Sequence, residues 1–174
     1  MSTPSRESQV RGLNRCVMEP SQRLLDAEKA LAADPENAAL WEEKGLALIE
    51  QGMYRESIEA FSKGIVRDPF RGNLYLERGH RHISCGEIEE AAADLHFAML
   101  MRPDDWNVYY HLGLAHYMLG EYDKAEKAFR FGLRLSDTDL ALIPMTNWCW
   151  ATLVHAGKME EAKELLKPIH KDMD

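Results

Sequence analysis

The sequence lacks paired cysteines, long apolar runs and any excess of basic residues. Its three cysteines, Cys16, Cys85 and Cys149, are an odd number at wide spacing without a CxxC motif, so no disulfide framework is expected. No apolar run reaches the roughly 18 residues that a membrane span needs. The net charge of −8 repels phosphate backbones, so we expect no nucleic-acid partner.

Signals for export, catalysis and metal binding are also missing. Residues 1–15 are polar and contain no apolar stretch, which favours a cytoplasmic protein unless an export signal has been removed. No nucleophile motif, glycine-rich phosphate loop or paired-carboxylate pattern occurs, so we expect no enzyme and no cofactor. His80 and His111 could meet on adjacent helices, but two imidazoles alone do not make a zinc site, so no metal is expected.

What the sequence does contain is a pattern that repeats every 34 residues. An aromatic residue, two glycines, a small residue, a second large apolar residue and a closing proline all recur at this spacing. The sets are Trp41, Tyr75 and Tyr109; Gly45, Gly79 and Gly113; Gly52, Gly86 and Gly120; Ser57, Ala91 and Ala125; Phe61, Leu95 and Phe129; and Pro35, Pro69 and Pro103. Each unit holds two amphipathic stretches around a glycine, such as 38–51 and 55–67, which predicts a helical hairpin.

The glycines inside the first helix of each unit need a packing reason. A glycine in mid-helix costs about 1 kcal/mol relative to alanine, so its regular recurrence indicates a close contact. The small residues Ala91 and Ala125 would lie on the facing second helices of their units. We therefore predict that Gly79 packs closely near Ala91, and Gly113 near Ala125.

The order and spacing of these residues resemble the tetratricopeptide repeat. In that family an aromatic residue is followed by Leu-Gly, a tyrosine, an Ala-x3-Phe pair and a proline. The third unit has the matching residues Tyr109, Leu112, Gly113, His116, Ala125 and Phe129. The resemblance implies an all-α, right-handed α-solenoid of helix-turn-helix repeats. Stretches such as 78–81, 110–117 and 160–166 resemble uncharacterised bacterial proteins of this family.

The chain is expected to divide into a tail, a capping helix and a repeat domain. Residues 1–20 should form a flexible polar tail, and residues 21–37 an N-terminal capping helix. The repeat domain covers residues 38–174, with three clear units and a deviant fourth, at 38–71, 72–105, 106–139 and 143–174.

The fourth unit departs from the rule of the other three. Pro144 is expected to start a helix, or to kink one that opens at Thr138, and Pro168 is expected to cut the last helix short. Trp150 stands where the other units have glycine. The C-terminal end has no polar cap and carries the apolar residues Leu165, Leu166, Ile169 and Met173. Because a repeat array needs capped ends, we expect this unit to pair with another copy, through Trp148, Trp150 or Leu166, or to be covered by a further helix of a longer protein.

One side of each first helix is expected to line a concave groove, which in the resembled family holds a peptide or a partner helix. At 100° per residue, this side lies opposite the repeat signature. It carries apolar, amide and imidazole groups, which are typical of a binding surface. The predicted groove residues are Asn73, Leu76, His80, Ile83, Asn107, Tyr110, His111, Leu114, Tyr117, Asn147 and Trp148. The three asparagines are expected to hydrogen-bond a peptide backbone.

Four carboxylates are expected to make one end of this groove acidic: Glu42, Glu43, Glu50 and Glu77. No predicted groove position carries lysine or arginine. A carboxylate clamp of the cochaperone type, which uses such residues, is therefore not expected. The acidic end instead favours a basic segment or a free N-terminus as the partner.

Three functions remain compatible with the sequence. The first is a non-catalytic adaptor or scaffold that binds a protein or peptide in the groove. The second is a type III secretion-type chaperone that holds an extended client, and the third is a self-assembly module. The apolar strip could instead be buried by neighbouring units or by the chain's own tail, and the sequence leaves these alternatives open.

Overall fold

The computed structural model describes residues 19–136 and 138–170, and this part of the chain contains helices but no strand. The predicted tail, residues 1–20, lies almost wholly outside the described residues. None of the described helices is both long and apolar enough to cross a membrane. The helices are α2 (Gln22–Ala33), α3 (Ala38–Glu50), α4 (Tyr54–Arg67), α5 (Gly72–Cys85), α6 (Ile88–Met101), α7 (Trp106–Met118), α8 (Tyr122–Leu135), α9 (Asp139–His155) and α10 (Met159–His170).

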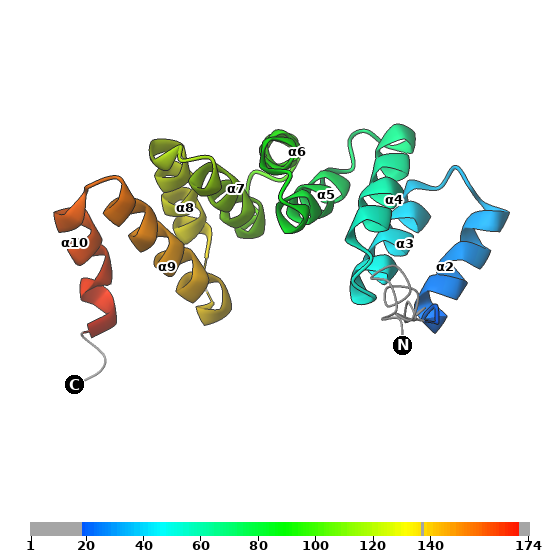
Figure 1. Cartoon of the computed structure of the whole chain (residues 1–174), viewed down its shortest axis with the longest axis horizontal. Coiled ribbons are helices and arrows are strands. Elements are labelled where there is room, and N and C mark those ends of the chain that lie inside the picture. The colour runs from blue at the N-terminus through cyan, green and yellow to red at the C-terminus, as the bar shows by residue number, and fades with distance from the viewer. Residues whose placement is uncertain (1–18, 137, 171–174) are drawn as a thin grey trace, which may run out of the picture.

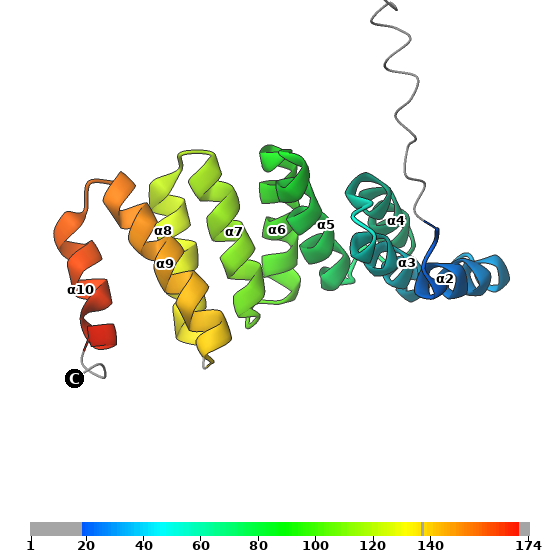
Figure 2. The same cartoon turned by 60° about the horizontal axis from the view of Figure 1, so that its bottom comes forward.

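The helices follow one another in antiparallel pairs along an arch, with α2 and α10 at its two ends (Figures 1 and 2). The first helices of the units are α3, α5, α7 and α9, and the second helices are α4, α6, α8 and α10. Helix α7 contacts both α5 and α9, whereas no comparable contact joins two second helices in the described part of the chain. The first helices therefore form the inner face of the arch, and the second helices form its outer face. The predicted all-α solenoid is confirmed.

Helix boundaries follow from local capping. Asn37 and Asp105 accept hydrogen bonds from the backbone N–H groups of Ala39 and Asn107, which satisfies donors that the first turn leaves without partners. The two helices of each unit are separated by a glycine with positive φ, as at Gly86 with φ 78°. The sequence pattern of glycine after the first helix thus marks a real left-handed turn.

The mid-helix glycines pack as predicted. A Cβ added to Gly79 would lie 2.8 Å from Cγ of Leu95 and 3.3 Å from the carbonyl oxygen of Ala91. A Cβ at Gly113 would lie 2.5 Å from the ring of Phe129, which is fully buried one turn after Ala125 on α8. The contact at Gly79 near Ala91 is confirmed, and the nearest neighbour of Gly113 is the phenyl ring of α8.

The first end of the array is capped as expected. Helix α2 packs on α3 in the position of a second helix, and it buries Leu24, Ala27 and Leu31 there. Leu24 joins a core cluster with Ala47 and Leu48 of α3. The predicted half repeat at the N-terminal end is therefore present.

The fourth unit differs from two expectations. Helix α9 begins at Asp139, before the expected boundary at 143, and Pro144 lies inside it. This is the longer helix opening at Thr138, in which proline removes only its own N–H donor. Helix α10 continues past Pro168 to His170, so the prediction that proline cuts it short was wrong. The lost hydrogen bond falls in the last turn, where few later bonds depend on it. Met173 lies outside the described residues.

Candidate functional site

The inner face brings most of the predicted groove residues together on neighbouring first helices. Contacts between α5 and α7, and between α7 and α9, join residues from both members of each pair. The predicted residues that stay half-buried are Asn73, His80, Ile83, Asn107, Tyr110, Tyr117 and Trp148, and Asn147 is exposed. This surface is therefore partly accessible along most of its length.

Four predicted groove residues are buried instead of available: Glu42, Leu76, His111 and Leu114. The 100° projection placed them on the open side, but adjacent first helices approach closely enough to cover them. Leu114 is 8% exposed and belongs to the core cluster shared by α7, α8 and α9. Their role is to pack one unit on the next.

The acidic end of the inner face is neutralised by the chain's own residues. Glu42 accepts hydrogen bonds from Arg71 and from the amide of Asn73. The amide oxygen of Asn73 accepts from Arg102 at 2.8 Å, and Arg102 also pairs with Asp105 at 2.6 Å. The side chain of Asn73 is thus committed at both ends, contrary to its predicted role in holding a peptide backbone.

A second arginine network closes the side toward α2. Arg23 of α2 holds Glu43 through two bonds, of 2.6 and 3.1 Å, and also pairs with Glu50. The bond from Arg23 lowers the pKa of Glu43. Burial raises the pKa of Glu77, the fourth carboxylate, which lies near Arg81. The prediction of a free acidic surface was wrong, because these arginines come from outside the groove positions of the first helices.

The middle of the inner face is a pair of stacked imidazoles. The rings of His80 and His111 lie 4.0 Å apart between centroids, as the sequence had allowed. The ring of His111 bonds the carbonyl of Asn107 at 2.9 Å. Burial lowers the pKa of His80 to about 3 and that of His111 to about 4. Both rings are therefore neutral at physiological pH and extend the apolar surface.

Aromatic side chains dominate the half of the inner face toward the C-terminus. The Tyr117 ring lies 5.1 Å from that of Trp148, and its hydroxyl lies 3.0 Å from Nδ1 of His155. Tyr122 stacks on His155 at 5.7 Å. Sequence analysis did not place Tyr122 in the groove, since it opens the second helix α8. Tyr122 lies close to Tyr117 because the turn at Gly120 between the two helices is short.

A further aromatic pair was also missed. Trp106 lies 6.5 Å from Tyr110 between ring centroids, and Tyr110 meets the ring of His111 edge-on at 5.0 Å. Trp106 stands one place before the first groove position of α7, so the helical projection left it out. It extends the ring cluster of His80, His111 and Tyr110, and it packs against the same core cluster around Leu114 as Tyr117 and Trp148 do.

The one fully buried cysteine of the described residues, Cys149, is not suited to nucleophilic chemistry. Burial raises the pKa of the Cys149 thiol to about 11, so the thiol stays protonated at neutral pH. No group of three or more metal-ligating side chains converges in the ranges 19–136 and 138–170. The inner face offers shape, neutral rings and a few hydrogen-bonding groups, which suits non-covalent binding.

The chain was compared with known families and structures. The family model of the tetratricopeptide repeat matches residues 24–71 and 76–139, which is more than half of the chain. No curated protein matches. One similar structure is residues 41 to the end of MamA from Desulfovibrio magneticus RS-1, with a TM-score of 0.79 and 20% identity over 95% of this chain and 91% of that one.

Two other similar structures are of proteins described as peptide-binding or peptide-bound. YrrB, described as a TPR protein with an unusual peptide-binding site, has a TM-score of 0.72 and 21% identity over 83% of this chain and 73% of that one. The first TPR of Spaghetti (RPAP3), bound to the HSP90 peptide SRMEEVD, has a TM-score of 0.61 and 24% identity over 68% of this chain and 97% of that one. At these identities the likeness shows the fold.

Proposed function

Because this chain belongs to the tetratricopeptide-repeat family, we propose that it is a non-catalytic adaptor that binds a protein or peptide segment on its inner face. The observation that carries the proposal is the row of aromatic and imidazole rings along the inner face from His80 to His155. Tyrosine and tryptophan are the residues most often found as binding anchors. The peptide-binding site of YrrB and the peptide bound to the RPAP3 domain agree with this role. A cytoplasmic location forms part of the proposal.

The surface favours a segment that presents apolar side chains. The rings of Tyr110, Tyr117 and Trp148 offer faces and edges but no net charge, and the two central histidines are neutral. The carboxylates near α3 are already bonded to Arg23 and Arg71, so they add little attraction for a basic segment. The free polar groups, such as the exposed amide of Asn147, set orientation more than affinity.

The test is a selection of displayed random peptides against the purified full chain, followed by binding measurements on the enriched peptides. Tyr110→Ala combined with Tyr117→Ala is expected to weaken binding by at least about thirtyfold, since anchor residues cost about 2 kcal/mol or more when truncated. Circular dichroism should show the helix content of the wild type.

The matched control lies on the charged part of the same face. Arg23→Ala removes a half-buried arginine and should change affinity by less than about threefold. If the tyrosine variant binds as tightly as the wild type, the inner face is not the binding surface. Enrichment of peptides that depend on Arg23 rather than on the tyrosines would also reject the proposed anchor.

A second candidate function, self-association through the C-terminal unit, is favoured by an apolar stripe on α9. Leu140 and Ile143 are 81% and 61% exposed, and Trp150 is 40% exposed on the same side of the helix. The expected site thus lies on α9, whereas Trp148 packs against Tyr117 on the inner face. Light scattering over a range of concentrations tests this. Ile143→Glu should convert a dimer to a monomer, and a wild type that is monomeric throughout would reject it.

A further inference from the structure

On the outer face, each pair of successive second-type helices flanks a first helix, and we call the strip over that first helix a furrow. The four furrows lie between α2 and α4, α4 and α6, α6 and α8, and α8 and α10. Because the units repeat, each position in one furrow has an equivalent 34 residues later in the next, with a three-residue shift in the fourth unit. The four furrows can therefore be compared position by position.

In three of these furrows, a charged side chain forms bonds between neighbouring helices. Lys44 of α3 pairs with Glu28 of α2 at 2.8 Å in the first furrow. Arg78 of α5 fills the second, where it bonds Ser62 of α4 at 2.9 Å.

In the second furrow Arg78 also holds Asp94 of α6 through two bonds, of 2.6 and 2.7 Å. In the fourth furrow Arg130 of α8 bonds Glu161 of α10 at 2.9 Å. A charged side chain of the protein itself thus occupies or spans each of these three furrows.

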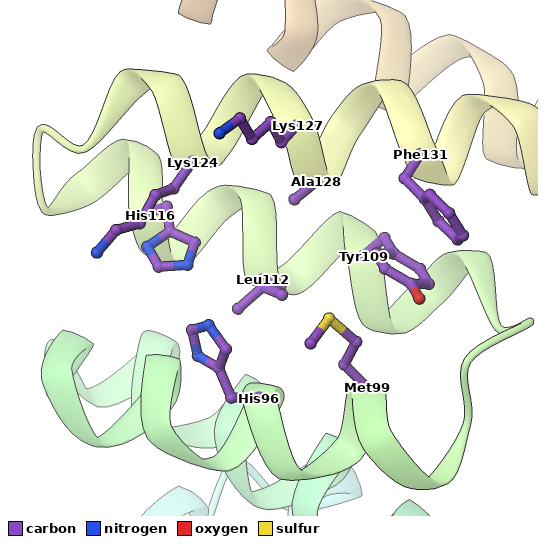
Figure 3. A pocket seen from close by; sticks show the side chains of 9 residues that line it. All are labelled: His96, Met99, Tyr109, Leu112, His116, Lys124, Lys127, Ala128 and Phe131. Carbon is purple, nitrogen blue, oxygen red and sulfur yellow. The ribbon is translucent and has the colours of Figure 1, made fainter.

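Among the residues that the structure describes, no such bridge crosses the third furrow, between α6 and α8. Leu112 of α7 stands where the earlier units have Lys44 and Arg78, and Ala128 stands where the second furrow has Asp94. The shorter apolar side chains leave an open hollow of about 340 Å³ (Figure 3). Its nine lining residues are His96, Met99, Tyr109, Leu112, His116, Lys124, Lys127, Ala128 and Phe131.

The hollow has an apolar part and a basic part. Met99, Tyr109 and Phe131 lie together at one end of Figure 3, and the rings of Tyr109 and Phe131 are 4.5 Å apart. Lys124 and His116 lie at the other end, and Lys127 lies above the middle. None of the lining residues is a carboxylate, although the chain has a net charge of −8.

One carboxylate from outside the lining pairs with two groups of the basic part, and Lys127 has no such bond to it. Glu121 accepts from Lys124 at 2.8 Å and pairs with Nδ1 of His116 at 2.6 Å. In the first furrow, by contrast, the positions equivalent to Lys124 and Lys127 are Glu56 and Glu59. The basic rim is thus particular to the third furrow and does not follow from the repeat.

We infer that the hollow between α6 and α8 is a binding site for a small organic anion with an apolar, preferably aromatic, body. Small-molecule sites are concave, mostly apolar and about 300–1,000 Å³, with a few polar groups that fix orientation. Tyr109, Phe131 and Met99 contact the apolar body, and Lys124 and Lys127 receive the carboxylate. The site uses the outer face and is independent of peptide binding on the inner face.

The probe is 4-phenylbutyrate, titrated into the full-length chain while the imidazole resonances of His96 and His116 are followed by NMR. Both resonances should shift with one saturable binding constant. The neutral isostere 4-phenylbutyramide should bind at least about fivefold more weakly, because it lacks the charge that the two lysines attract. The peptide-binding variant Tyr110→Ala with Tyr117→Ala should retain the wild-type affinity for the acid.

Two variants introduce into the third furrow the residues found at equivalent positions of the other furrows. Leu112→Arg with Ala128→Asp recreates the bridge formed by Arg78 and Asp94, and should abolish binding by filling the hollow. Lys124→Glu with Lys127→Glu copies the acidic rim of the first furrow and should weaken acid binding by at least about tenfold. These lysines are exposed, so the second variant tests the site even if the first fails to fold.

Lys163→Glu with Lys167→Glu is the matched control. It makes the same change in net charge on α10, at lysines in exposed pairs away from the hollow, and should leave affinity within about twofold of the wild type. The inference is overturned if no saturable shift is seen, if the amide binds as tightly as the acid, or if both lysine pairs have equal effects. Binding of the capped dipeptide phenylalanyl-glutamate without binding of 4-phenylbutyrate would place a polypeptide there and overturn it too.

Discussion

The two halves of the inner face share one backbone frame and differ in chemistry. Around α3 and the start of α5, carboxylates are held by arginines in a network that runs from Glu42 through Asn73 to Arg102. From His80 onward, the described residues of the inner face bring neutral rings together, and the rings of His80, His111, Tyr117 and Trp148 take part in no ion pair there. The repeat fixes where side chains point, whereas their identity decides whether the chain satisfies itself or leaves a surface for a partner.

This difference explains why one half is the better binding candidate. A carboxylate that already accepts two hydrogen bonds loses them if a ligand displaces its arginine, so little affinity is gained. A half-buried ring such as that of Tyr117 keeps part of its surface accessible, and covering that part breaks no ion pair. The charged half therefore joins units together, and the aromatic half remains available.

The first test asks whether the helix packing at the mid-helix glycines is the same in both halves, and the effect expected at neutral pH is the largest. Gly79→Leu in the charged half and Gly113→Leu in the aromatic half should each destabilise by about 2–3 kcal/mol, because each side chain would collide with a buried residue. Chemical denaturation measures both. A large loss of unfolding free energy for one glycine variant and none for the other would show that the two halves pack differently.

The second test breaks the charged network alone. Glu42→Ala leaves Arg71 and Asn73 without their shared acceptor, in a position where the carboxylate is only 9% exposed. We expect a loss of about 1–2 kcal/mol, measured by urea unfolding. Glu50→Ala, at an exposed pair with Arg23, should cost well under about 1 kcal/mol. Equal costs for the two variants would contradict the picture of Glu42 as a buried link between units.

The third test is a pH dependence of stability to which the histidine pair contributes. The pKa values of His80 and His111 are lowered in the folded state to about 3 and about 4, from an ordinary value of 6.5. Between the folded and the ordinary pKa values, the unfolded chain binds more protons than the folded chain. The free energy of unfolding is therefore highest above about pH 6.5 and decreases as the pH falls toward 4. His80→Gln with His111→Gln should flatten this part of the wild-type curve, measured by melting temperature between pH 7 and 4. A variant curve parallel to that of the wild type would show that the pair does not titrate in this way.

The fold was predictable because its signals are local and repeated. A proline after the second helix, a turn glycine such as Gly86 and a mid-helix glycine such as Gly79 each act within one hairpin, so 34-residue spacing sufficed. Pro168 shows the limit of this reasoning. A rule about proline in the interior of a helix was applied to a last turn, where little helix remains to be broken.

The surface was less predictable because it depends on residues outside the repeat signature. A helical projection separates two sides of α5, but it cannot show that α7 covers Leu76 on the open side. Nor does it show that Arg23 or Arg102 reaches across a loop to a neighbouring unit. The pairing of His80 with His111 was foreseen because both lie at groove positions of adjacent first helices.

The contacts among the helices also have a consequence for how the molecule folds and opens. Every substantial contact in the described part joins helices that are next to each other along the chain, or next but one. Such a chain closes only short loops during folding, which favours rapid folding from any nucleus. Opening should then begin at the ends, so amide protons of α6 and α7 should exchange with solvent more slowly than those of α2 and α10. The inner rings from His80 to Tyr117 lie in that slow-exchanging middle, which gives the binding surface its most persistent support.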